Sequence, residues 1–244
     1  MIELISVHIP KCAGTSFSTV LRKTYGETLL GDQVDQPMDP ERPFQKNFAA
    51  WKEEQDRKPA PPGKRAIHGH FWAGKYDRQA PNAKRITWLR HPIKRLISHY
   101  YFWLSTPELP HSLHKHVIQN KLSLLEFAQL PPLQNLLHNI FLRDRSLDGF
   151  DFVGISEHFQ EDLDCLCKQM NWPRQQMTQE RRTVHKDYKP EALEPDVEKK
   201  LQALNEADLA MYESALKMRT RRMAPPRLWV RFANVLRDLA PRVR

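Results

Sequence analysis

The stretch ISVHIPKCAGTSFSTVL, residues 5–21, decides the fold of this chain. It joins a short apolar, β-branched run, Ile2 to Ile9, to a segment from Thr15 to Thr24 whose apolar residues have helical spacing. Pro10 separates the two. The stretch therefore predicts a strand, a tight loop and a helix. Because backbone N–H groups and the helix dipole favour an anion at a helix N-terminus, we expect a phosphate group to bind in this loop.

The residues of this loop suit an anion. Gly14 lets the backbone come close, Thr15 and Ser16 offer hydroxyl donors, and Lys11 supplies a mobile positive charge. The loop is not a Walker A motif, because its lysine precedes the glycine. In the structural alternative, Thr15 caps the helix and Lys11 is a surface residue. The candidate ligands in the loop are Lys11, Ala13, Gly14, Thr15, Ser16 and Phe17.

A second strand-to-helix turn lies in WLRHPIKRLISHY, residues 88–100. A strand at Arg85 to Leu89 leads into a helical pattern from Ile93 to Leu104, with Pro92 suited to the first helical position. Arg90 at the strand end and Ser98 two turns along the helix are candidate ligands of one anion. In the alternative interpretation, this arginine-rich helix is a solvated face.

The remaining pattern alternates strands with helices. Further strands are expected at Arg65 to His68 and Phe152 to Ile155, which predicts an α/β fold with a mostly parallel central sheet flanked by helices in three layers. The proline-dotted segment from Gly31 to Gly63 is interpreted as an excursion from the core, with a short helix at residues 44–56. The expected later helices are residues 123–130, 133–142, 159–170 and 195–222.

The length of 244 residues is that of one domain. Of the formal net charge of +9, eight charges belong to Lys217 to Arg244, which holds nine basic residues and one acidic residue, Asp238. We therefore divide the chain into a domain of residues 1–222 and a basic amphipathic helix of residues 223–244. This helix packs on the domain or, in the alternative, contacts a membrane surface.

The expected location is cytoplasmic. Three cysteines, Cys12, Cys165 and Cys167, are too few for a disulfide framework and fit a reducing compartment. No run approaches the roughly 20 apolar residues of a spanning helix. Residues 1–10 also lack the basic and apolar regions of a signal peptide.

The segment AIHGHFW, residues 66–72, brings two histidines to the end of a predicted strand, where active-site groups of α/β sheets gather. An acceptor hydroxyl needs a base, so His70 is our first candidate for general base and His68 the second. A metal site is the alternative, but this pair has no evident third ligand, so no metal is predicted. Another histidine cluster, His111, His114 and His116, is predicted to lie on the surface.

Residues 8–17 resemble the 5′-phosphosulfate loop of sulfotransferases that use 3′-phosphoadenosine 5′-phosphosulfate (PAPS), in the form of the carbohydrate (uronyl and heparan sulfate) 2-O-sulfotransferase-like branch. This resemblance implies a P-loop-like fold and a contact between Lys11 and the oxygen that bridges phosphate and sulfate. Residues 90–98 resemble the family's 3′-phosphate motif, with His91 where aspartate is usual. His-Gly-His recurs in the same branch, where these histidines are implicated in catalysis.

Other resemblances are more local. Residues 152–159 are similar to the family's strand and helix that close the nucleotide site, and residues 208–212 are similar to its late helix. A basic stretch with Arg181, Arg182 and His185 is a candidate cover for the nucleotide, and Arg182 is its candidate ligand.

The sequence thus predicts a sulfotransferase that moves the sulfuryl group of PAPS to an acceptor hydroxyl, with adenosine 3′,5′-bisphosphate as product and no nucleic-acid partner. The transfer is expected to be in-line, with a histidine base, and the acceptor to be a carbohydrate or glycoconjugate. One alternative is a phosphotransferase on the same scaffold, which needs an acidic magnesium ligand at a strand end. The other is a non-enzymatic binder of anionic surfaces through the C-terminal helix.

Overall fold

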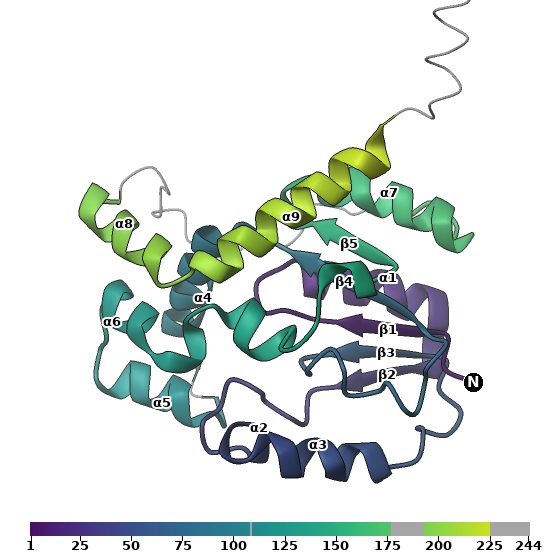
Figure 1. The fold of residues 1–244 in the computed structure, drawn as a ribbon, viewed down its shortest axis with the longest axis horizontal. Coiled ribbons are helices and arrows are strands. Elements are labelled where there is room, and N and C mark those ends of the chain that lie inside the picture. The colour runs from purple at the N-terminus through teal and green to yellow at the C-terminus, as the bar shows by residue number, and fades with distance from the viewer. Residues whose placement is uncertain (108, 177–192, 225–244) are drawn as a thin grey trace, which may run out of the picture.

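The structure is a computed structural model that describes residues 1–107, 109–176 and 193–224. A five-stranded sheet in the order β2-β3-β1-β4-β5 forms its centre, and all four neighbouring pairs are parallel (Figure 1). This arrangement confirms the predicted α/β fold. The strands are β1 (Leu4–Val7), β2 (Leu29–Asp32), β3 (Ala66–Gly69), β4 (Lys84–Leu89) and β5 (Phe152–Ile155).

Helices cover both faces of the sheet. In Figure 1, α9 crosses in front of the strands and α1 lies behind them, while α2 and α3 run below β2. Every residue of β1, β3 and β5 is buried, as expected for strands of a parallel sheet covered on both faces. The helices are α1 (Gly14–Tyr25), α2 (Pro43–Lys46), α3 (Phe48–Arg57), α4 (Pro92–Ser105), α5 (Ser112–Gln119), α6 (Leu124–Gln129), α7 (Phe159–Met170), α8 (Pro195–Ala203) and α9 (Glu206–Met223).

One predicted helix is wrong. Residues 133–142 form a 3₁₀ turn at Pro131–Leu133 and a π-helical turn at Leu137–Phe141 instead of one α-helix. Asn135 between them has a φ of 46°, in the left-handed region. The Asp208 carboxylate of α9 accepts the Leu137 and His138 amides at 3.0 and 2.9 Å. A distant helix therefore satisfies amides that local sequence would have assigned to a regular helix.

The interpretation of residues 31–63 as an excursion from the core is also wrong. The segment begins inside β2, a strand that the sequence did not reveal, and the predicted helix at residues 44–56 is two helices, α2 and α3. The Phe44 and Trp51 side chains are 2% and 5% exposed and belong to the main core. The segment is therefore part of the domain's packed body.

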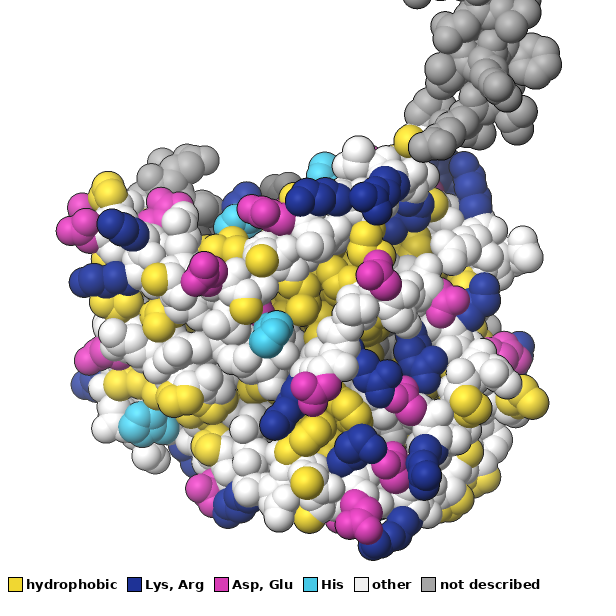
Figure 2. Space-filling model, in the orientation of Figure 1, with side chains coloured by type: hydrophobic (Ala, Val, Ile, Leu, Met, Phe, Trp, Pro, Cys, Tyr) yellow, Lys and Arg dark blue, Asp and Glu magenta, His cyan; other side chains and the backbone are white. Residues whose placement is uncertain are grey.

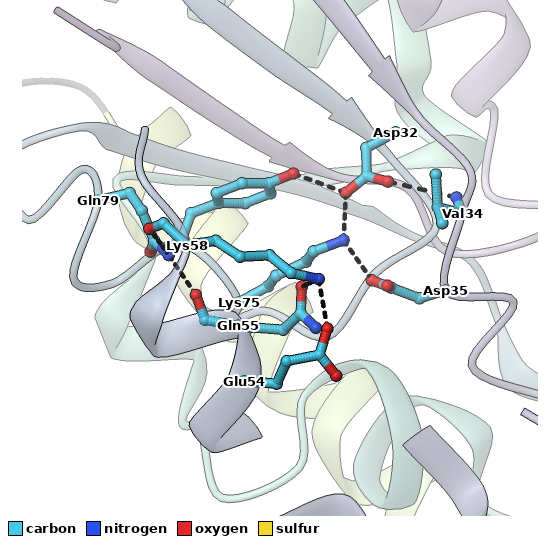
Figure 3. A network of polar contacts seen from close by, with 9 residues as sticks. Asp32, Val34, Asp35, Glu54, Gln55, Lys58, Lys75 and Gln79 are labelled. Atoms are coloured by element: carbon cyan, nitrogen blue, oxygen red, sulfur yellow. Dashed lines mark hydrogen bonds and ion pairs between the residues drawn. The ribbon is translucent and has the colours of Figure 1, made fainter. Parts of the chain in front are cut away.

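A buried ionic network ties this segment to the connection between β3 and β4 (Figure 3). The Lys75 ammonium lies 2.7 Å from an Asp32 carboxylate oxygen and 2.6 Å from an Asp35 oxygen. The Tyr76 hydroxyl donates to the same Asp32 oxygen at 2.7 Å. Because its charges are paired inside the protein, this network fixes the end of β2 against the chain that follows β3.

The prediction for the second histidine cluster is wrong for two of its three residues. His111 and His114 are buried, and only His116 is exposed. The His114 ring lies 3.1 Å from the Trp103 carbonyl through Nε2 and accepts the Leu109 amide through Nδ1. Local sequence could not predict this burial, because the partners belong to α4 and the chain that follows it.

Part of the basic C-terminal region, residues 217–244, stabilises the packing of the domain. Figure 2 shows Lys and Arg side chains gathered along the upper part of α9. Arg219 donates to the buried Asp162 carboxylate at 2.8 Å, and Arg222 donates to the Val153 carbonyl at 3.0 Å. These two arginines of the basic C-terminal region therefore anchor α9 to β5 and α7.

Two predictions fall outside the described residues. One is the candidate cover with Arg181, Arg182 and His185. The other is the predicted C-terminal helix, of which residues 225–244 are outside. Met223, assigned to that helix, is the last residue of α9. No helix within the described ranges is long and apolar enough to span a bilayer.

Candidate active site

The loop between β1 and α1 has the form expected of an anion-binding turn. Lys11 and Ala13 have φ angles of 66° and 59°, and Ala13 is the N-cap of α1 without a side-chain cap. The alternative in which Thr15 caps the helix is therefore wrong. The Phe17 amide donates to Ala13 O at 3.0 Å, whereas the amides of residues 14–16 donate to no described residue. These amides are available to an anion.

Gly14 is required by a close approach. A Cβ atom at this position would lie 1.7 Å from Nε2 of His8. The start of α1 thus rests directly on the His8 ring, a residue that the sequence did not single out.

His8 is the centre of a stack of three histidine rings. Its ring centroid lies 5.0 Å from that of His68 and 4.1 Å from that of His70, with interplanar angles of 13° and 26°. The parallel pairing of β1 with β3 sets this stack, because it aligns Ser6 with His68. The two predicted histidines therefore share one site with a third.

The hydrogen bond of His70 defines its tautomer. Nδ1 of His70 lies 2.6 Å from the His8 carbonyl oxygen, which can only accept, so Nδ1 carries the proton and Nε2 carries the lone pair. The His70 amide donates to Asp32 O at 3.0 Å, which fixes its main chain as well. Burial lowers the pKa of His70 to about 4, so this ring is neutral at pH 7.

His68 is more enclosed. His68 is 4% exposed, whereas His70 is partly exposed. Nδ1 of His68 lies 2.9 Å from the Ser6 hydroxyl. Burial, followed by the neighbouring His70, lowers the pKa of His68 to about 4. The Phe17 ring packs on His68 at 6.1 Å between centroids, so the Phe17 side chain belongs to the core. His70 is thus the more accessible of the two candidate bases.

The two predicted anion motifs meet at Lys11 and Arg90. Nη1 of Arg90 donates to the Lys11 carbonyl at 3.3 Å. Burial, followed by the positive charge of Arg90, lowers the pKa of Lys11 to about 8. Neither cation is ion-paired with a carboxylate in the part of the chain that the structure describes. Two positive charges that lie close together and are not neutralised by a described carboxylate are suited to bind an anion.

The turn after β4 is tethered by β5 and α9. α4 starts at Pro92, as predicted, and the amide of its N-cap, His91, donates to Glu157 at 3.0 Å. The Ser156 hydroxyl donates to Leu89 O at 2.9 Å, and the Tyr212 ring lies 5.5 Å from the His91 ring. Segments 152–159 and 208–212 thus support the Arg90 turn.

Two residues of α4 complete this region. Ser98 is partly buried, and its hydroxyl forms no hydrogen bond with another described residue. Arg95 is 0% exposed, and none of its guanidinium nitrogens has a hydrogen-bond partner among the described residues. Its charge interacts with the Asp208 carboxylate of α9. Since burial raises the pKa of Cys12 to about 12, that thiol stays protonated.

The chemistry of the site is that of an anion-binding turn beside a neutral histidine. Across the described residues, no group of three or more His, Cys, Asp or Glu side chains is placed to hold a metal ion. The loop amides, Lys11 and Arg90 are a donor set that fits a phosphate- or sulfate-bearing nucleotide.

A family model described as "Sulfotransferase family" matches residues 2–123, which include Lys11, both candidate bases, Arg90 and Ser98. A search of curated proteins found no match.

Two solved structures are similar to this chain. A sulfotransferase from Alicyclobacillus acidocaldarius is 19% identical, with a TM-score of 0.42, and the match covers 88% of this chain and 95% of that one. Mouse sulfotransferase SULT7A1, complexed with PAP, is 15% identical, with a TM-score of 0.36, and the match covers 70% of this chain and 57% of that one.

Proposed function

The chain belongs to the sulfotransferase family, and from that membership we propose that it transfers the sulfuryl group of PAPS to a hydroxyl group of a carbohydrate or glycoconjugate. One observation carries the proposal. Lys11 and Arg90, which come from separate motifs, meet beside the unpaired amides at the start of α1. A donor with phosphate and sulfate groups would satisfy these cations and amides together.

The donor-binding residues follow from the two turns. We assign the 5′-phosphosulfate to Lys11, to the amides of residues 14–16 and to the hydroxyls of Thr15 and Ser16. We assign the 3′-phosphate to Arg90 and Ser98. Ala13 contributes its left-handed backbone, which turns the loop into the helix. Arg182, which lies outside the described residues, stays a predicted ligand.

His70 is the proposed general base, and His68 packs behind His8 as a supporting residue. The proton on Nδ1 of His70 is held by the His8 carbonyl, which leaves the Nε2 lone pair to take the proton of the acceptor hydroxyl. The donor supplies an activated sulfuryl group. As the acceptor oxygen bonds to sulfur and the bond from sulfur to the bridging oxygen breaks, the Lys11 ammonium stabilises the charge left on that oxygen.

The phosphotransferase alternative requires a carboxylate that binds magnesium beside the phosphate loop. Among the described residues, Glu157 is the carboxylate at the Arg90 turn, and its oxygen accepts the His91 amide. No observation favours this alternative over sulfuryl transfer.

The first experiment is calorimetry of adenosine 3′,5′-bisphosphate binding beside ADP with magnesium. We expect micromolar-range bisphosphate binding that weakens about 10- to 100-fold in Arg90→Ala, since a hydrogen bond to a charged group is worth about 1.5–3 kcal/mol. Arg78→Ala is the matched control, because Arg78 is exposed. Preference for ADP with magnesium, or no bisphosphate binding, would overturn the proposal in favour of phosphoryl transfer.

The second experiment tests the base. His70→Ala should lower turnover of a saccharide acceptor about 10²- to 10⁴-fold, the usual contribution of general base catalysis, with bisphosphate affinity unchanged. His68→Ala should cost less. The reverse order would assign the base to His68.

A further inference from the structure

Phe102 lies on α4 against the predicted catalytic lysine. The Lys11 ammonium is 4.0 Å from the centroid of the Phe102 ring, within the range of a cation–π interaction. Phe102 is 36% exposed and follows Ser98 by one helical turn, so the two residues share a face of α4. This exposed aromatic ring therefore belongs to the same face as the predicted 3′-phosphate ligand.

The ring is the contact that holds the end of the Lys11 side chain. Arg90 holds the main chain of Lys11 through its carbonyl. The ammonium, at the end of a flexible four-carbon stem, makes no hydrogen bond or ion pair with another described residue. Its position consequently depends on Phe102.

The other groups around Lys11 do not favour its charge. Arg90 repels the ammonium, and burial disfavours its charged form. His8 of the loop and His99 of α4 interact with Lys11, and burial lowers the pKa of both well below the usual value, so they are neutral. The Cys12 thiol is protonated at neutral pH. The electron-rich face of Phe102 thus attracts the charged form, and no carboxylate of the described residues is paired with it.

We propose that Phe102 is a positioning residue that keeps Lys11 charged and directed along α4 in the free enzyme, ready for the phosphosulfate group. The inference rests on the proposed function for the role of Lys11, and it adds a residue outside both anion motifs. It accounts for the exposure of a large aromatic side chain beside the donor site.

The direct test is the pKa of Lys11, measured by NMR of protein labelled with ¹³C at lysine Cε and assigned by the signal lost in Lys11→Arg. A cation–π attraction of about 0.5–1 kcal/mol corresponds to about half a pH unit. Phe102→Leu should lower the Lys11 pKa by that amount, and Phe102→Tyr should leave it unchanged because the ring is retained. An unchanged pKa in Phe102→Leu would overturn the inference.

Bisphosphate affinity supplies a second readout. Because only the charged lysine attracts phosphate, Phe102→Leu should weaken binding about two- to threefold at pH 8.5 and leave it unchanged at pH 6.5. Equal weakening at both pH values would instead mean that Phe102 only packs. Leu104→Ala, a 44% exposed position of the same helix, is the control and should change neither value.

The two proposals fail in different ways. The lysine titration needs neither donor nor turnover, so it tests Phe102 even if the wild-type protein binds no bisphosphate. Normal bisphosphate binding with no pKa change in Phe102→Leu would reject the inference alone.

Discussion

Lys11 and Lys75 follow neighbouring strands of the same sheet, yet their surroundings differ. Lys75 is 7% exposed and contacts two carboxylates at 2.7 and 2.6 Å. Lys11 is partly buried, has an aromatic ring for a neighbour and is ion-paired with none of the described carboxylates. A buried charge that is fully paired holds a fold together, whereas one held without a counter-charge is available to a ligand.

The largest expected effect comes from replacing Lys75, the lysine that is paired with two carboxylates. Lys75→Met leaves the carboxylates of Asp32 and Asp35 buried without their cation, so the free energy of unfolding should fall by about 3–5 kcal/mol. Urea denaturation measures this change.

A matched surface pair provides the control. Lys58 pairs with Glu54 at 2.9 Å in the same region, but its side chain is 52% exposed (Figure 3). Lys58→Met should cost less than about 1 kcal/mol. Similar losses in the two variants would show that the buried network is not what stabilises this part of the fold.

The second effect concerns the unpaired side. Lys11→Met should reduce turnover about 10²- to 10³-fold, the usual cost of removing a group that stabilises developing negative charge. The free energy of unfolding should change by less than about 1 kcal/mol, because no carboxylate among the described residues loses its partner with Lys11. Steady-state kinetics and urea denaturation test the two parts. A stability loss as large as that of Lys75→Met would remove the distinction between the two lysines.

The smallest expected effect is on the pH dependence of the unfolding free energy, through His99. Burial lowers the pKa of His99 well below 6.5. As the pH falls below 6.5, this histidine therefore takes up a proton in the unfolded chain but stays neutral in the folded protein. The stability contribution is present above pH 6.5 and is lost as pH falls, by up to about 1.4 kcal/mol per pH unit for each such histidine. His99→Phe should therefore flatten the fall in unfolding free energy between pH 6.5 and 5. An unchanged slope would mean that His99 is protonated in the folded state.

Local patterns predicted the elements that depend on near neighbours. The strand at Phe152 to Ile155 and the helix at residues 159–170 have the predicted bounds, and Pro92 starts α4 as expected. β2 was missed because Leu29–Asp32 is a short edge strand that ends in a glycine and an aspartate. These four residues have the composition of a loop. The Asp32 carboxylate is accommodated in the strand because it pairs with Lys75, which lies more than forty residues later in the chain.

The sequence by itself determined the two strand–loop–helix units and the placement of a cation in each turn, because apolar spacing and turn residues act over a few positions. Only the tertiary structure decided which of these groups meet. The His8 ring stacks on two histidines about sixty residues away because β1 and β3 are parallel neighbours, and that contact also requires glycine at Gly14. Lys11 and Phe102 likewise meet because α4 packs beside the loop, a consequence of burying apolar faces that no local pattern encodes.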